Sequence, residues 1–84
     1  MYQYVLKGGF NMKNLSMLSV GEKGKVKELL ATDSLRRRFR DIGIMDGTTI
    51  KCTGISTHGD IASYLIKGAV IALRQKDAEK IIIE

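Results

Sequence analysis

The sequence has few of the residues that usually carry catalysis, metal binding or a covalent framework. Its 84 residues include one cysteine and one histidine, with no proline and no tryptophan. Structural zinc sites use four nitrogen or sulfur ligands, usually in paired spacings, so the isolated Cys52 and His58 cannot supply one. One cysteine also excludes an internal disulfide, which agrees with a reducing compartment. We therefore expect no metal centre and no cofactor, with Cys52 buried and His58 in a solvated turn.

Long apolar runs and catalytic motifs are also missing. No stretch approaches the roughly 18 to 20 apolar residues that cross a bilayer, and residues 1–10 lack the features of a secretory signal. No nucleophile lies near a base, and Gly21 and Gly24 lack the Lys-Ser/Thr pair of a phosphate-binding loop. We expect a cytoplasmic protein that is not an enzyme and does not insert into the membrane.

Basic charge is concentrated in the first half of the chain. The formal net charge is +5, and residues 1–42 carry nine basic and four acidic side chains, whereas residues 43–84 carry five of each. Such an asymmetry favours a partner with an acidic surface, whether protein, nucleic acid or anionic lipid. An excess of this size also keeps a small domain in solution, so both interpretations stay open.

A chain of this length makes one domain. Residues 1–14 show no clean period and are expected to form a loose leader, within which Met12 is a candidate translational start. Residues 15–84 are expected to form the folded domain.

Hydrophobic periodicity predicts a mainly β domain of about five short strands. The first strand should span residues 24–31, and because Glu28 shares the face of Val26 we predict an edge strand. Further strands are expected from Gly47 onward and at 61–67, 70–73 and 81–83, with a turn at 58–60, a tight turn at Gly68-Ala69 and one helical turn at 76–80.

Between the first two strands, the sequence predicts a helix of about two turns. Leu35, Phe39 and Ile42 form one apolar stripe, and Thr32, Asp33 and Ser34 offer N-terminal caps. Gly43 supplies a left-handed residue that ends the helix, and Ile44 is placed for the apolar contact of a Schellman cap. A helix this short needs a sheet to dock against.

In so short a chain, a bent sheet is expected to curl into a small, partly closed barrel. The run 81–83 should pair with the first strand. One short helix then follows the first strand, and a short helical turn precedes the last.

The arginines of the helix are the main candidate for a binding surface. Arg37 and Arg40 should point outward, while Arg36 and Arg38 flank the apolar stripe. One interpretation is a solvated helix face whose arginine stems cover apolar surface. The other is a dock for an acidic partner, since the guanidinium fork suits carboxylate and phosphate.

The same region resembles a known family. The run Arg38-Phe39-Arg40-Asp41-Ile42-Gly43-Ile44, followed by Gly47-Thr48, is similar to the Arg-Leu-x-x-Leu-Gly-Leu-x-Pro-Gly-Thr signature of the FeoA family. Gly59-Asp60, Gly68, Ala72-Leu73-Arg74 and Ala78-Glu79-Lys80-Ile81 continue the match in order, so that it covers about residues 15–83. The chain has Asp46 and Ile61 where members often carry proline.

This resemblance implies an SH3-like barrel that acts in bacterial ferrous iron uptake with FeoB, a membrane transporter with a cytoplasmic GTP-binding domain. The expected partner-binding residues are Arg36, Arg37, Arg38, Arg40 and Met45, and the expected structural turn residues are Gly43, Gly47 and Gly68. Alternatives are a regulatory domain related to those of iron-dependent repressors, and a weak transition-metal-binding protein. Nucleic acid is not the expected partner, because stacking platforms near the basic region are lacking.

Overall fold

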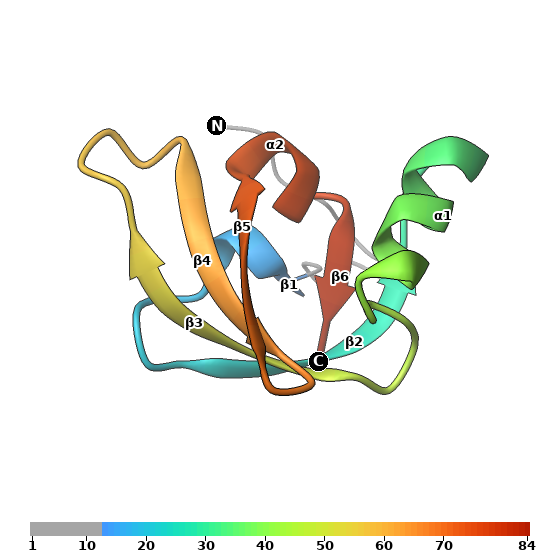
Figure 1. The fold of residues 1–84 in the computed structure, drawn as a ribbon, viewed down its shortest axis with the longest axis horizontal. Coiled ribbons are helices and arrows are strands. Elements are labelled where there is room, and N and C mark those ends of the chain that lie inside the picture. Colours follow the sequence, from blue (N-terminus) through green and yellow to red (C-terminus); the bar gives the residue numbers. More distant parts are fainter. Residues whose placement is uncertain (1–12) are drawn as a thin grey trace.

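Residues 13–84 are described by the computed structural model. They form one antiparallel sheet of six strands, a 3-10 turn and two short helices (Figure 1). In chain order these are β1 (Lys13–Asn14), η1 (Leu15–Met17), β2 (Lys23–Leu29), α1 (Asp33–Asp41), β3 (Thr49–Ile55), β4 (Ile61–Ile66), β5 (Ala69–Arg74), α2 (Gln75–Ala78) and β6 (Ile81–Ile83). The predicted mainly β fold, with a helix after the first long strand and a helical turn before the last, is confirmed.

The strand β2 bends the sheet, because its two halves pair with different neighbours. In the spatial order β1-β6-β2-β3-β4-β5, the first half of β2 pairs with β3 and the second half with β6. A register shift between Val26 and Glu28 lies within the half that pairs with β6. A bulge adds one residue and increases the local twist, so the strand turns from one part of the sheet to the other.

This arrangement corrects two predictions about β2. It is an interior strand between β6 and β3, and the prediction of an edge strand was wrong. Glu28 broke the expected alternation because the bulge exposes it, although Val26 two residues earlier is buried. The strand also ends at Leu29, two residues before the predicted boundary.

The start of the folded domain and the β4–β5 turn also differ from the sequence prediction. Lys13 and Asn14, placed in the predicted leader, form β1 and pair with Ile83 and Ile82, two residues before the expected start of the folded domain. The rest of that leader, including Met12, lies outside the described residues. The tight turn between β4 and β5 is made by Lys67 and Gly68, both with positive φ, and Ala69 already pairs with Ile66.

The core lies in the concave side of the bent sheet and takes its members from every strand except β1. On β3 and β4 the expected alternation holds, with Ile50, Cys52, Ala62, Tyr64 and Ile66 buried. All three isoleucines of β6 are buried, which agrees with its pairing to β1 and β2. Within residues 13–84, no helix has the length and apolar character required to span a membrane.

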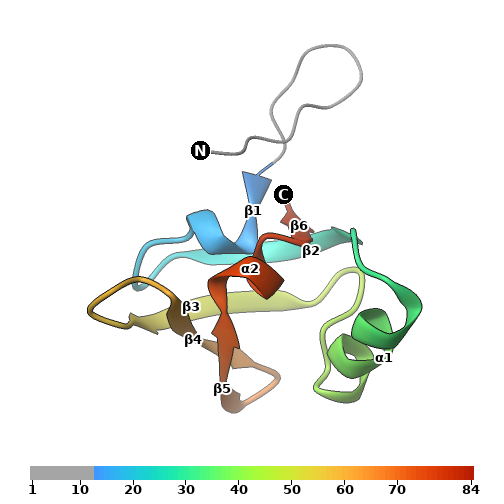
Figure 2. The same cartoon turned by 90° about the horizontal axis from the view of Figure 1, so that it is seen from above.

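The helix α1 lies at one end of β3, and the loop of residues 56–60 lies at the other (Figures 1 and 2). The full length of β3 separates the helix from this loop. Features around α1 are therefore separate from those of the β3–β4 hairpin tip.

Candidate functional site

The helix α1 is held against the domain by its apolar stripe. Leu35 and Phe39 are buried, and Ile42 packs half-buried at the edge of the core. Thr32 is the N-cap residue but makes no side-chain capping hydrogen bond. The expected cap by Asp33 or Ser34 is therefore absent, and packing of the stripe replaces it in fixing the helix.

A Schellman cap ends α1 and aims the following turn. The Gly43 amide donates to the Arg40 carbonyl at 3.0 Å, and the Ile44 amide donates to the Phe39 carbonyl at 2.8 Å. These are the two hydrogen bonds of the motif, and Gly43 has the left-handed φ of 95° that it needs. Ile44 is fully buried, so the predicted apolar contact beyond the cap is confirmed.

Further hydrogen bonds tie this turn to β2. The Gly47 amide donates to the Val26 carbonyl and the Val26 amide donates to the Thr48 carbonyl, both at 2.8 Å. The Thr48 hydroxyl donates to the Gly43 carbonyl at 3.2 Å. The helix, the turn and the strand that it leads into thus form one unit fixed to the middle of the sheet.

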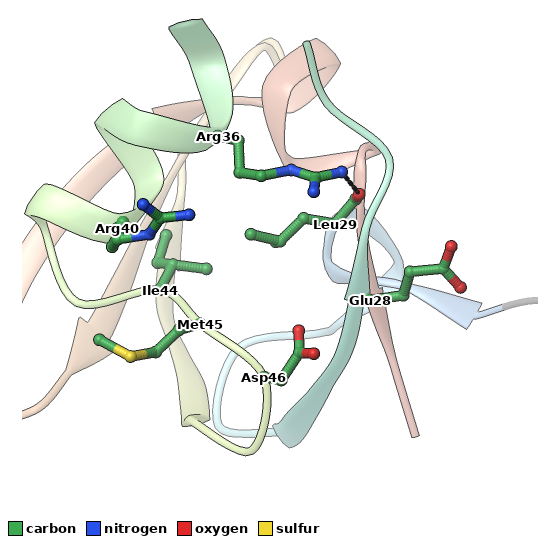
Figure 3. A pocket seen from close by; sticks show the side chains of 7 residues that line it. All are labelled: Glu28, Leu29, Arg36, Arg40, Ile44, Met45 and Asp46. Atoms are coloured by element: carbon green, nitrogen blue, oxygen red, sulfur yellow. Dashed lines mark hydrogen bonds between the residues drawn. The ribbon is translucent and has the colours of Figure 1, made fainter. Parts of the chain in front are cut away.

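Between α1, this turn and the end of β2 lies a cleft of about 510 Å³ (Figure 3). We call it the arginine cleft. Its lining residues come from three segments: Arg36 and Arg40 from α1, Glu28 and Leu29 from β2, and Ile44, Met45 and Asp46 from the turn. Arg36 and Arg40 are four residues apart, which places them on one helix face.

The arginine cleft carries opposite charges on opposite sides. The two guanidinium groups extend from α1, and the carboxylates of Glu28 and Asp46 lie on the β2 and turn side (Figure 3). Arg36 Nη2 donates to the Leu29 carbonyl at 3.1 Å, which fixes one guanidinium across the upper part of the cleft. Leu29 adds partly exposed apolar surface, the Ile44 side chain is buried, and the exposed Met45 lies beside them.

The structure separates the predicted partner-binding residues. Arg36, Arg40 and Met45 come together in the arginine cleft, and the exposed Arg37 lines neither this cleft nor the next. Arg38 instead lines a second cavity of about 180 Å³ between α1 and β5, with apolar neighbours that include Phe39 and Ile71. Arg40 is exposed like Arg37, and it also shares a helix side with Arg36, four residues before it, so that both line the cleft.

Sequence reasoning missed the acidic side of the cleft. Glu28 was visible only as a break in the alternation of β2, and Asp46 only as a departure from the family signature. The bulge in β2 and the Schellman turn place these two residues opposite the arginines. Their spacing along the chain does not reveal this.

The candidate metal and stacking residues give no second site. Cys52 is buried with its Sγ near the Gly54 carbonyl, and His58 is exposed. Within residues 13–84, no group of three His, Cys, Asp or Glu side chains could hold a metal ion. Phe39 and Tyr64, the aromatics of this part of the chain, are both buried, and burial raises the pKa of the Tyr64 hydroxyl.

Comparison with known proteins identifies the family of this chain. The model of the FeoA domain family matches residues 13–84. A FeoA-like protein from Clostridium acetobutylicum is 29% identical and superposes with a TM-score of 0.79, over 87% of this chain and 85% of that one. A search of curated proteins finds no match.

Two less similar structures share the fold. One is FeoA from Stenotrophomonas maltophilia, described as a prokaryotic SH3 domain protein and solved with zinc (21% identity, TM-score 0.76, 86% of this chain and 89% of that one). The other is a manganese-dependent transcriptional repressor (22% identity, TM-score 0.79). The match covers 90% of this chain and 39% of the repressor. The chain therefore belongs to the FeoA family and has its SH3-like fold, which metal-dependent repressors also contain.

Proposed function

We propose that this FeoA-family protein is a cytoplasmic interaction module, not an enzyme, that binds the GTP-binding part of an FeoB-type ferrous iron transporter and modulates it. The observation that carries the proposal is the arginine cleft, which is concave, charged on both sides and fixed in shape by backbone hydrogen bonds. Membership of the FeoA family connects this protein with ferrous iron transport, to which FeoA proteins belong. Met45 and the two cleft arginines are the proposed contacts.

The lining of the cleft indicates what part of a partner it would take. A carboxylate suits Arg36 and Arg40, because guanidinium groups bind carboxylates with paired hydrogen bonds. An apolar side chain would cover Leu29, and a basic group would lie near Glu28 or Asp46. Met45 at the side of the cleft is 41% exposed and flexible enough to adapt to the partner. A segment with an acid, an apolar residue and a base in this order fits best.

Relatives support this role rather than the alternatives. The Stenotrophomonas protein is described as a candidate activating factor of bacterial ferrous iron transport. The repressor shares only the fold, and this chain spans well under half of its length. Zinc bound to the Stenotrophomonas protein keeps weak metal binding as a second candidate, to be tested by anaerobic titration with ferrous iron. A 1:1 complex of micromolar affinity or tighter would favour that candidate.

The test compares two charge reversals on the same helix. Arg40→Glu alters the cleft, and Arg37→Glu makes the same charge change one helical step outside it. Binding of each variant to the isolated GTP-binding domain of the FeoB-type transporter from the same organism is measured by calorimetry. We expect Arg40→Glu to weaken binding at least tenfold, since loss of a charge-assisted contact at a protein interface costs about this much or more. We expect Arg37→Glu to change it less than threefold.

Two results would count against the proposal. Equal losses in both variants would mean that the general basic charge, not the cleft, attracts the partner. Unchanged affinity of folded Arg40→Glu would remove the cleft from the interface. Circular dichroism of both variants checks that α1 is retained.

A further inference from the structure

A second basic surface lies on the outer face of the sheet, away from the arginine cleft. The register pairs Lys23 with Lys51, Lys51 with Leu65, and Leu65 with Val70. Directly paired residues project from the same face of a sheet, so these four side chains form one row across β2, β3, β4 and β5. The row begins with two ammonium groups and ends with two aliphatic side chains.

This row faces solvent. The neighbouring row alternates to the inner face, and its Ile50 and Ile66 are buried in the core. In the outer row, Leu65 is 36% exposed and Val70 64% exposed. Two large aliphatic side chains thus lie in water beside two lysines, in a position fixed by the sheet.

The same face continues on both sides of the row. Lys25 pairs with Thr49, and the exposed Ile61 pairs with Arg74. We call the set of Lys23, Lys25, Lys51, Ile61, Leu65, Val70 and Arg74 the lysine face. Neither it nor the side chains paired with it include an aspartate or glutamate.

Two acids lie in the turns that adjoin the face. The Glu22 carboxylate, just before β2, accepts from the Ser19 amide at 2.6 Å, and the Asp60 carboxylate, just before β4, accepts from the Ser56 hydroxyl at 2.9 Å. Each carboxylate makes a hydrogen bond within its own turn, and Asp60 also borders the cavity that Ile61 and Arg74 line. Four cations and three exposed aliphatic residues therefore share the face.

We propose that the lysine face binds the surface of an anionic phospholipid membrane. Lysine ammonium groups act as point charges on flexible stems, which suits mobile headgroup phosphates. Each lysine or arginine near an anionic surface strengthens binding roughly fivefold, and the aliphatic residues add area that enters the headgroup region. The protein lies on the membrane without a span.

The composition of the face favours lipid over two other polyanions. Single-stranded nucleic acid is bound by stacking on aromatic side chains, and Phe39 and Tyr64 are buried on the other side of the sheet. Fixed protein carboxylates are matched best by arginine, which this chain places on α1, whereas three of the four cations on the face are lysines. The proposal does not depend on the transporter as partner, although a membrane protein would place the module near such a surface.

The experiment measures co-sedimentation of the full chain with large unilamellar vesicles. Vesicles of phosphatidylcholine alone are compared with vesicles that contain about one-third phosphatidylglycerol, at 50 mM NaCl. We expect binding to the anionic vesicles only. The variant Lys23→Glu/Lys51→Glu should bind at least tenfold more weakly, because two attractive charges become repulsive. Leu65→Ser/Val70→Ser should weaken binding about threefold or more by removing the apolar contact.

The matched control is Arg37→Glu/Arg38→Glu on α1. Each double reversal removes four units of charge, so both lower the formal net charge from +5 to +1. We expect the α1 variant to keep most of the vesicle binding. Equal losses in the two variants, no binding of the wild type to anionic vesicles, or equal binding to neutral vesicles would each overturn the proposal. Stronger loss of binding to random-sequence DNA than to vesicles in the lysine variant would assign the face to nucleic acid instead.

Discussion

The arginine cleft and the lysine face divide the basic charge of this protein into two surfaces of different kinds. In the cleft, two arginines oppose two acids, and one guanidinium is held by the Leu29 carbonyl. On the face, the cations are mostly lysines, and exposed aliphatic side chains take the place of acids. A concave site with fixed charges of both signs suits one defined partner segment. An open face with charge of one sign suits a mobile surface of repeated anionic groups.

The two surfaces also rest on different supports. The cleft depends on a short helix that is held by a few buried side chains and a glycine cap. The lysine face lies on four hydrogen-bonded strands, so that its side chains can change without loss of the backbone beneath them. Perturbations beneath α1 should therefore have large effects, and perturbations on the face should be mild for stability.

The largest expected effect comes from Phe39→Ala. Phe39 is 2% exposed and is the main buried side chain of α1, so its truncation should lower the free energy of unfolding by about 3 to 5 kcal/mol. Leu65→Ala on the lysine face should cost less than about 1 kcal/mol, because the side chain is already partly in water. Urea unfolding followed by circular dichroism measures both. Similar losses in the two variants would contradict the difference in support.

Much of the helix–turn–strand unit could be predicted from the sequence. Leu35 and Phe39 gave the buried stripe, and Gly43 with Ile44 gave the Schellman cap, because both signals lie within a few residues of one another. The bulge in β2 could not be predicted in this way. It is set by the pairing of β2 with β6, which is more than fifty residues away along the chain.

The candidate site was predictable only in part for the same reason. The arginines were visible as a cluster, but which of them share a face with Glu28 and Asp46 depends on the helix angle and on the bulge. The lysine face was less visible still. Lys51, Leu65 and Val70 are unremarkable in the sequence, and only the register of three strand pairs aligns them with Lys23.

The next largest effect is expected in the salt dependence of binding, which should differ between the two surfaces. Raising NaCl from 50 to 300 mM should weaken vesicle binding about tenfold or more, because the lysine face relies on exposed charges of one sign. Binding of the transporter domain should fall less, since the cleft pairs both signs in a partly enclosed site. Calorimetry and co-sedimentation across the same salt series give the two slopes. A steeper slope for the transporter domain would reverse the assignment of the two surfaces.

Two glycine turns allow a comparison of variants with a similar expected loss of stability. Gly43 at the end of α1 and Gly21 before β2 have φ of 95° and 94°, so alanine at either position should lower the free energy of unfolding by about 1 to 2 kcal/mol. A Cβ at Gly21 meets nothing within 4 Å, and one at Gly43 meets the flexible Lys67 side chain at 3.2 Å. We expect Gly43→Ala alone to weaken binding of the transporter domain, by about threefold or more, because it shifts the turn that carries Met45. Equal binding by the two variants would show that the turn can move without consequence for the cleft.

The smallest effect is expected at Glu22, the acid next to the lysine face. The hydrogen bond from the Ser19 amide, aided by the charge of Lys13, holds the pKa of the Glu22 carboxyl below its ordinary value of 4.5. A lowered pKa in the folded state stabilises the protein above about pH 4.5, and this contribution is lost as the pH falls through the lowered value. The thermal midpoint of the wild type should therefore exceed that of Glu22→Gln slightly at pH 7, and the difference should shrink by pH 3. Because the carboxylate is fully exposed, the difference should also shrink in high salt at pH 7, and a gap that instead widens toward pH 3 would exclude this turn as a source of acid sensitivity.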